Sequence, residues 1–506
     1  MVATVLSATN IGFDGQIIEV ECDASKGLPG LQIVGLANKS VDEAKERVRS
    51  AIKNSHLDFP SAKITINLAP ANIPKSGAQF DLPIAIAILC VSNQLRTSEI
   101  ERGVFAGEVS LDGTLRPIRG VINIAETAKS NGASTLYIPM QNAAQASLIQ
   151  GIDIVGVESL KDLFLVLKKE KQPTHVSKIS DTNTRKTQKT HAISIDDIYG
   201  QDRAKRALTI AAAGHHNILF TGPPGTGKTM LAKALLQLLP PLSLGEQIEV
   251  TKLHSLSGLT TTDTLLDRPF RSPHHTASHI SIIGGGKHPI PGEVSLAHHG
   301  VLFLDELPEY PRASLEALRQ PLEDRSVHIS RAEDRVSFPA NFMLVATKNP
   351  CPCGYLGDTS KECSCSHTQI SQYQKKISGP LLDRIDLIVH VGRIPHKLLL
   401  KKQSTDQATM AKNQIIKARK LQKERYGSSI ISNASLGSQD LKKNIDLSSD
   451  VSTFLTQAAK KLQLTTRSYF KVIKVSQTIA DLENAHNITT SHIAEALQFR
   501  DVSKEV

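Results

Sequence analysis

The pattern of hydrophobic and polar positions changes three times along this chain. Residues 1–167 mix β-branched runs, as at Gln16–Val20 and Lys63–Leu68, with helical stretches at Val41–Asn54 and Leu82–Val91. Alternation of apolar and polar positions is typical of strands, and recurrence at helical spacing is typical of helices. Glycine-containing turns separate these runs, so the pattern favours one α/β domain over this stretch.

The remaining chain falls into three further stretches. Residues 168–192 are polar, rich in Lys and Thr and without apolar periodicity, which is typical of a flexible linker. Residues 193–394 return to an α/β pattern, and residues 395–506 are helical in character. Helices in this last stretch are predicted at Gln407–Tyr426, Ser449–Lys461, Thr466–Glu483 and Thr490–Gln498.

The charge balance of the chain is basic. Lys and Arg number 59 against 49 Asp and Glu, so a polyanion such as DNA or RNA is a candidate partner. A basic surface without any partner is the alternative, because charge alone does not distinguish the two. The N-terminus lacks the features of an export signal, and no apolar run is long enough to span a bilayer. We therefore expect a cytoplasmic protein with no membrane partner.

A glycine-rich loop follows a short apolar run. Asn217–Thr221 predicts a buried strand, and Met230–Leu239 predicts a helix. Between them lies a phosphate-loop motif made of Gly222, Pro223, Pro224, Gly225, Thr226, Gly227, Lys228 and Thr229. In such a loop, backbone N–H groups surround phosphate oxygens, Lys228 reaches the β- and γ-phosphates, and Thr229 ligates Mg²⁺. The motif predicts an ATP site with Mg²⁺ as cofactor; a chance glycine-rich turn is the alternative.

A second apolar run ends in two carboxylates. Gly300–Leu304 predicts a buried strand, and Asp305 and Glu306 follow it directly. We expect Asp305 to hold Mg²⁺ through water and Glu306 to orient and polarise the attacking water. Taken alone, such a strand could end in solvated acids. Together with the phosphate loop it indicates ATP hydrolysis.

Three further residues are candidates for sensing the nucleotide. Asn349 follows a third apolar strand, where an amide could position water against the γ-phosphate. Arg384 lies at a helix-to-strand junction and could face the nucleotide of a neighbouring subunit, although a salt bridge with Asp383 or Asp386 is the alternative. Arg467 opens a predicted helix and by itself would be a solvated helix charge.

Four cysteines crowd into one short segment, as the pairs Cys351/Cys353 and Cys363/Cys365. Two close pairs around a turn resemble a zinc knuckle with four thiolate ligands. In a chain without an export signal, this clustering favours a metal over disulfides. The spacing within each pair is tighter than usual, so reduced and partly buried thiols, with His367 as an alternate ligand, are the second interpretation.

With these motifs together, the chain resembles the magnesium-chelatase-like AAA+ ATPases of the YifB/ComM family, from about residue 5 to residue 500. Beyond the ATP motifs, the resemblance is carried by Gly27–Leu36, Asn67–Ala71, Phe80–Ala85, Ala204–Leu208, Phe270–Ala277, Pro291–Ala297, Asn349–Gly354 and Gly379–Arg384. These segments lie between residues 27 and 384, in both of the predicted α/β parts of the chain.

The resemblance implies an architecture. Residues 1–167 would form a ribosomal-S5/Lon-protease-like α+β domain, residues 193–394 a P-loop AAA+ motor built on a parallel α/β sheet, and residues 395–506 a C-terminal helical lid. A helix-2 insert at about 268–297 and a hairpin at about 326–339 would face the pore of a homo-hexamer.

The resemblance also implies roles and partners. Asn349 would be sensor 1, Arg384 the arginine finger and Arg467 sensor 2, acting on its own or on a neighbour's nucleotide. Members of the family act as hexameric DNA motors. The ComM branch drives branch migration while incoming DNA is integrated in natural transformation, which makes single-stranded or branched DNA the implied partner.

The chain departs from what the resemblance implies in two places. Thr347-Lys348 stands where the family has small or apolar residues before the sensor Asn, and Lys348 could tune ATP turnover or touch DNA. Lon-type proteases carry a serine nucleophile shortly after a Pro-Lys pair, but Gln79 occupies that place here, so we expect no proteolysis. A metal-chelatase-type motor subunit and an ATP-dependent remodeller of a protein partner are the alternative functions.

Two basic residues are candidates for DNA contact. The hairpin Val327–Phe338 carries Arg335, and the glycine-rich insert carries Lys287. Cations on such loops can follow a phosphate backbone. The alternative is that Arg335 pairs with Glu333 or Asp334 and that Lys287 is only solvated.

Overall fold

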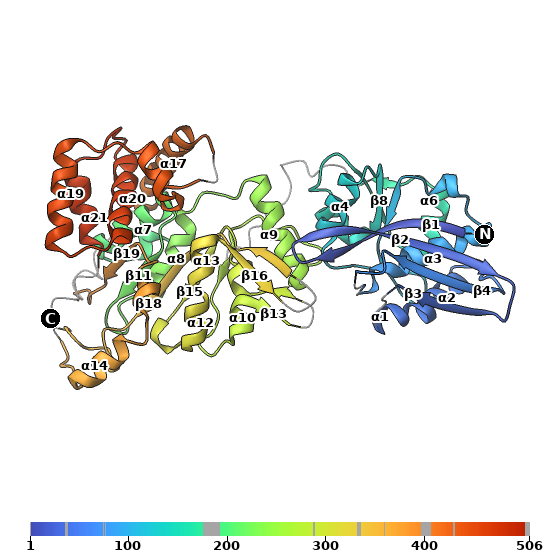
Figure 1. Ribbon diagram of the computed structural model, residues 1–506, viewed down its shortest axis with the longest axis horizontal. Coiled ribbons are helices and arrows are strands. Elements are labelled where there is room, and N and C mark those ends of the chain that lie inside the picture. Colours follow the sequence, from blue (N-terminus) through green and yellow to red (C-terminus); the bar gives the residue numbers. More distant parts are fainter. Residues whose placement is uncertain are drawn as a thin grey trace.

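The computed structural model describes residues 2–35, 39–73, 75, 77–175, 193–286, 289–330, 335–358, 360–395, 406–428 and 431–500. Figure 1 shows a sheet-rich N-terminal part beside a larger part, in which a second sheet is flanked by helices and the last helices gather at the far end. The predicted α/β class with a helical C-terminal part is confirmed.

The N-terminal sheet has eight strands in the order β10-β9-β8-β5-β1-β2-β4-β3. The strands are β1 (Val2–Ile11), β2 (Asp14–Ser25), β3 (Gly30–Val34), β4 (Lys63–Ala69), β5 (Gly103–Phe105), β8 (Thr135–Pro139), β9 (Asp153–Val157) and β10 (Thr174–His175). The predicted strands at Gln16–Val20 and Lys63–Leu68 lie in β2 and β4. Strand β10 lies within the range predicted as a linker, and residues 176–192 of that range are outside the described residues.

Helices α2 (Ala44–Asn54), α3 (Asp81–Val91), α4 (Val121–Ser130) and α6 (Leu160–Leu167) accompany this sheet. Every residue of α3 is buried, because the helix packs between strands β1 and β2 and helix α2. A helix covered on all sides needs no polar face, which explains its apolar sequence after Asp81, whose carboxylate pairs with Arg47 over 2.7 Å. The helix predicted over Val41–Asn54 is interrupted at Glu43, between α1 (Lys39–Asp42) and α2.

The second sheet is parallel throughout and has the strand order β12-β15-β18-β11-β19. Its strands are β11 (Ile218–Thr221), β12 (Phe270–Arg271), β15 (Val301–Leu304), β18 (Met343–Lys348) and β19 (Leu387–His390). Because parallel strands share one carboxyl edge, the residues that follow β11, β15 and β18 meet there. This edge holds the phosphate loop, the acid pair and the predicted sensor Asn.

The C-terminal helices are α17 (Gln407–Tyr426), α18 (Ser438–Asn444), α19 (Ser449–Lys461), α20 (Thr466–Leu482) and α21 (Thr490–Gln498). They pack on helix α7 (Asp202–Gly214) of the motor through α17 and α20. The fully buried His216 joins the two parts, with ring nitrogens 2.8 Å from Thr478 Oγ1 and 3.3 Å from Asp386 Oδ2. Within the described ranges, no helix combines the length and the apolar character needed to cross a membrane.

The N-terminal part contacts the motor through helix α9 (Leu244–Ser257) (Figure 1). The Lys252 ammonium lies 2.6 Å from a Glu126 carboxylate oxygen and 4.1 Å from the centre of the Phe13 ring. The Ser255 hydroxyl accepts a hydrogen bond of 2.9 Å from the Gly120 backbone N–H. These contacts tie helix α9 to α4 and to the β1–β2 turn.

The same turn also packs on a hairpin of the motor, formed by β16 (Ser326–Ser330) and β17 (Arg335–Pro339). Phe13 belongs to one apolar cluster with Leu253, Val336 and Phe338. A Cβ on Gly12 would stand 2.3 Å from Val336 Cγ1, so the close approach requires glycine there. The N-terminal part therefore contacts the hairpin that, by the family resemblance, would face a pore.

Candidate nucleotide site

The phosphate loop joins the buried strand β11 to helix α8 (Lys228–Leu238). Gly225 and Gly227 have φ angles of 77° and 86°, a region that glycine adopts without steric cost. The Lys228 ammonium donates hydrogen bonds to the carbonyl oxygens of Gly222 (2.7 Å) and Pro223 (2.8 Å). Burial lowers the pKa of Lys228. Phosphate oxygens would offer this partly desolvated cation stronger partners than two backbone carbonyls.

The acid pair lies directly beside the loop. Asp305 follows β15, and its Oδ2 accepts a hydrogen bond of 3.3 Å from the Thr229 hydroxyl. The structure thus brings together the two residues predicted to hold Mg²⁺, and a hydroxyl with a carboxylate suits a hard cation. Glu306 comes next with a φ of 53°, an uncommon angle for a residue other than glycine that turns the chain away from the strand.

Thr347 connects the two acids to strand β18. Its fully buried hydroxyl donates to Asp305 Oδ1 over 2.5 Å and accepts a hydrogen bond of 2.9 Å from the Glu306 backbone N–H. The sequence marked Thr347 only as a departure from the family pattern. A polar residue at the end of an otherwise apolar strand, next to the strand that carries the acid pair, was the signal that could have revealed this role.

Asn349 lies at the same edge, one residue beyond the end of β18. Its Oδ1 accepts a hydrogen bond of 3.1 Å from the Lys228 ammonium. A cavity of about 550 Å³ opens beside these residues, with Gly222, Asn349, Tyr373 and Val391 among its lining. The side chain predicted as sensor 1 is therefore in direct contact with the phosphate-loop lysine.

Arg384 and Arg467 lie elsewhere, at the opposite end of the sheet. Arg384 stands before the amino end of β19 and Arg467 opens α20, and both donate to the carboxylate of Glu323 at the end of α13 (Arg319–Asp324). Arg384 also donates to the Pro380 carbonyl oxygen over 2.8 Å. Burial opposes ionisation of Glu323, but the two guanidinium charges outweigh it and lower the pKa of this carboxyl.

The pairing of Arg384 and Arg467 with Glu323 affects the predicted roles of both arginines as nucleotide sensors. The salt bridge predicted as the alternative for Arg384 is found with Glu323 rather than with Asp383 or Asp386. Arg384, Arg467 and Glu323 line a cavity of about 600 Å³ that also includes Asn217 at the amino side of β11. Because the phosphate loop leaves the carboxyl end of that strand, the arginines face away from the nucleotide site of their own chain.

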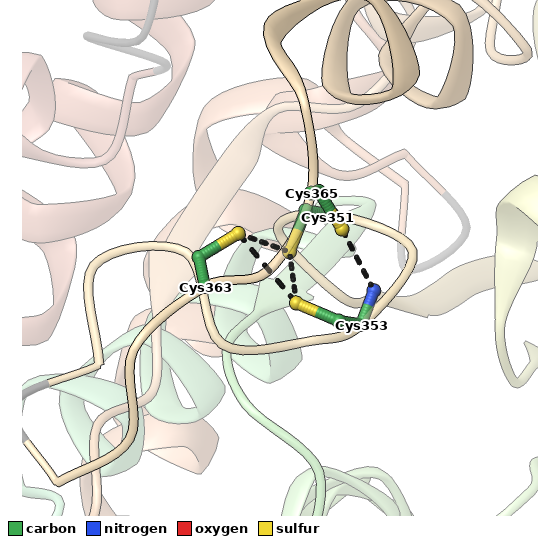
Figure 2. A group of neighbouring side chains, drawn as sticks. All are labelled: Cys351, Cys353, Cys363 and Cys365. Carbon is green, nitrogen blue, oxygen red and sulfur yellow. Dashed lines mark hydrogen bonds between the residues drawn. The ribbon is translucent and has the colours of Figure 1, made fainter.

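The four cysteines converge after Asn349 (Figure 2). Sulfur–sulfur distances are 3.3 Å for Cys351–Cys353, 3.6 Å for Cys351–Cys363 and 3.5 Å for Cys353–Cys363, and Cys365 Sγ lies 3.4 Å from the Cys353 backbone nitrogen. Four thiolates around tetrahedral Zn²⁺ stand about 3.8 Å apart, so the cluster fits this ion. A backbone hydrogen bond from Tyr355 lowers the pKa of Cys353 to about 6, whereas burial and the neighbouring thiols outweigh a backbone hydrogen bond and raise the pKa of Cys363 and Cys365.

The cysteine loop also touches the nucleotide site. Gly354 has a φ of 85°, and a Cβ there would stand 2.8 Å from Pro224 Cδ in the phosphate loop. Asp358 pairs with Arg393 over 2.9 Å, which ties the loop to the segment after β19. An ion bound by the cysteines would therefore hold in place a wall of the ATP site.

Of the two residues predicted to contact DNA, the structure describes Arg335 but not Lys287. Arg335 is exposed at the start of β17. Lys287, and the hairpin tip with Glu333 and Asp334, lie outside the described residues. The insert around Lys287 contains α10 (His279–Ile283), the pair β13 (Gly284–Gly285) and β14 (Ile290–Pro291), and α11 (Glu293–Leu296).

A phosphate loop after an inner strand of a parallel sheet, with an acid pair on a nearby strand and a helical part behind it, defines a P-loop nucleotide-binding protein of the AAA+ type. Comparison with known families agrees with this class. The family described as magnesium chelatase, subunit ChlI, matches residues 194–399, and the models described as subunit ChlI of Mg-chelatase and as its C-terminal part match residues 20–142 and 405–500.

Relatives with known sequences match this chain over nearly their full length, and two of them illustrate the similarity. Competence protein ComM of Haemophilus influenzae is 43% identical over 504 residues, covering 98% of this chain and 97% of the relative. The YifB protein of Escherichia coli is 40% identical over 497 residues, covering 98% of this chain and 96% of the relative. This chain belongs to the YifB/ComM family of magnesium-chelatase-like proteins, as its sequence motifs predicted.

Proposed function

We propose that this protein is a hexameric, ATP-driven motor that acts on DNA, and that it drives branch migration during recombination of incoming DNA in natural transformation. The observation that carries the proposal is the division of the ATP machinery between two ends of one sheet. Lys228 and the acid pair lie at the carboxyl end, and Arg384 and Arg467 lie at the amino end. Such a site is complete only when the arginines of one copy meet the nucleotide of the next.

The residues at the carboxyl end divide the work of hydrolysis. Lys228 would exchange its carbonyl partners for the β- and γ-phosphates, and Asn349 would turn from Lys228 toward the attacking water. Thr229 and Asp305 would hold Mg²⁺, which neutralises developing phosphate charge. Glu306 would polarise the water, while Thr347 fixes the position of its backbone.

Hydrolysis at an interface between two copies of the chain would also involve Glu323. In the isolated chain its carboxylate holds Arg384 and Arg467 together. A neighbour's γ-phosphate would compete with this carboxylate for both guanidinium groups, because phosphate oxygens accept their forked donors equally well. The two arginines would then move as one unit when ATP is present.

Support for DNA as the substrate comes from three independent features. The chain carries a net charge of +10, the hairpin β16–β17 presents the exposed Arg335, and one full-length relative is a competence protein. Docking of the β1–β2 turn on this hairpin gives the N-terminal part a role as its support. We further propose that Cys351, Cys353, Cys363 and Cys365 bind a structural Zn²⁺ that braces the phosphate loop.

The test is the ATPase rate measured without DNA, with single-stranded DNA and with a branched DNA junction. Stimulation by DNA, strongest with the junction, together with ATP-dependent movement of that junction, is the expected result. The family match to a magnesium-chelatase subunit favours a second candidate, a motor that drives metal insertion through partner subunits. An ATPase rate indifferent to every DNA would favour this chelatase-type role or remodelling of a protein partner instead.

A further inference from the structure

A second polar cavity lies between the lid and the amino end of the motor sheet, away from the phosphate loop. Its volume is about 310 Å³. The lid contributes Arg419, Lys420 and Lys423 from helix α17, and the motor contributes Arg268 and Glu246. With four cationic side chains against a single carboxylate, this cavity has an excess of positive charge.

The carboxylate is already fully engaged by other groups. Glu246 forms an ion pair with Arg268 at 3.4 Å and accepts a hydrogen bond of 2.8 Å from the Ser243 backbone N–H that starts α9. Arg268 in turn donates to the carbonyl oxygens of Pro240 (2.6 Å) and His299 (2.5 Å). These two residues compensate one another, and Lys420 lies 4.0 Å from a Glu424 carboxylate oxygen on its own helix, so the charges that remain are those of Arg419 and Lys423.

Arg419 is the less exposed of these two cations. Its Nε atom is buried and has no hydrogen-bond partner among the described residues. Burial, together with repulsion from Arg268 and Arg325, lowers the pKa of this guanidinium to about 10. Arg419, Lys420 and Lys423 sit within about one helical turn of α17, so Arg419 and Lys423 project from the same side.

We propose that this cavity is a second anion site, which binds a phosphate group between the lid and the motor. A guanidinium fork matches two phosphate oxygens, and Lys423 adds a flexible cation beside it. Asn341 and Ser432 line the same cavity and can donate further hydrogen bonds. A bound phosphate would link α17 to the motor and hold the lid in one position. This site goes beyond the proposed DNA motor and does not depend on it.

The chain contains no tryptophan, which allows a local reporter. Ile416 lines the cavity and is 57% exposed, so Ile416→Trp would place a single indole at the site. The reporter is introduced together with Lys228→Ala, which disables the phosphate loop. Inorganic phosphate is titrated at constant ionic strength with chloride as the control, and ADP is titrated in parallel. We expect a saturable change in emission with phosphate.

Two variants decide whether Arg419 holds the anion. Arg419→Gln should weaken phosphate binding by about tenfold or more, as expected for loss of a charge-assisted hydrogen bond. Lys412→Gln, an exposed position of the same helix outside the cavity, should leave binding unchanged. If ADP gives the same Arg419-dependent response, the site binds a nucleotide phosphate, and if only phosphate does, it binds the free ion. Should Arg419→Gln fail to fold, Arg419→Lys keeps the charge, loses the fork and should also bind more weakly.

Several results would overturn the proposal. An identical phosphate response in Arg419→Gln would place the anion elsewhere, and an equal response to chloride would show an ionic-strength effect only. No phosphate response, combined with loss of self-association in Arg419→Gln, would instead assign Arg419 to an acidic side chain of a second copy.

Discussion

Replacing Thr347 by valine removes one hydroxyl and leaves the shape of the side chain nearly unchanged. In the structure, this hydroxyl donates to Asp305 Oδ1 at 2.5 Å and accepts from the Glu306 backbone N–H at 2.9 Å. The Thr347 side chain is fully buried, so water cannot replace it. The substitution therefore leaves one carboxylate oxygen and one backbone N–H without their partner.

The size of the effect follows from these two contacts. A hydrogen bond to a charged group contributes about 1.5–3 kcal/mol, and a buried donor left unpaired costs a similar amount. If the contacts position Asp305 and Glu306 for the transition state, most of this energy appears in the activation barrier. Thr347→Val should then lower kcat for ATP hydrolysis roughly 10- to 100-fold.

The assay is steady-state ATPase activity alongside equilibrium binding of a fluorescent ATP analogue. Nucleotide affinity should change less than kcat, because Lys228 and the loop backbone are untouched. Thr347→Ser retains the hydroxyl and should recover most of the activity, which separates the hydrogen bonds from packing. A kcat for Thr347→Val within twofold of the parent would refute the positioning role.

The remaining predictions address the other parts of the machinery. Glu306→Gln should bind ATP and assemble but nearly cease hydrolysis, and an ATPase rate equal to the parent would remove Glu306 from its assigned role. Mixing Arg384→Ala with Lys228→Ala protein should restore partial ATPase activity through mixed interfaces, whereas a mixture as inactive as either variant contradicts action on a neighbour. Elemental analysis of the purified protein should find about one zinc ion per chain. Removal of this zinc by a chelator should lower the ATPase rate, whereas a protein that is active without metal would favour simple thiols. Arg335→Gln should flatten the salt dependence of DNA binding with basal ATPase unchanged. Phe13→Ala, which loosens the hairpin support, should reduce DNA stimulation but not the basal rate; full stimulation would uncouple the N-terminal part from the hairpin.

Local sequence determined the individual elements of this protein to a large extent. The helix predicted at Gln407–Tyr426 coincides with α17, and that predicted at Ser449–Lys461 coincides with α19. Helix limits are set by caps and by the spacing of apolar residues within a few turns, and such information is contiguous in the sequence. The phosphate loop and the acid pair were also readable, because their chemistry requires fixed residue types at fixed short spacings.

Contacts between distant segments were decided only by the tertiary structure. Glu323 is separated from Arg384 by 61 residues and from Arg467 by 144, and nothing local to any of the three indicates that one carboxylate holds both arginines. Thr347 gained its role from the pairing of β15 with β18, which sets a hydroxyl beside two acids. The packing of the β1–β2 turn on the β16–β17 hairpin was likewise decided only by the tertiary structure.

The cysteine cluster was determined partly by the local sequence and partly by the tertiary structure. The spacing of the four residues suggested a metal, but the convergence of their sulfur atoms and the contact of Gly354 with Pro224 depend on how the loop folds over the sheet edge. The cavity around Arg419 had no sequence signal at all, because its walls come from helix α17, the start of α9 and the amino end of the sheet. Sequence specifies local backbone preferences and short motifs, whereas the placement of an unpaired charge depends on long-range packing that local preferences do not encode.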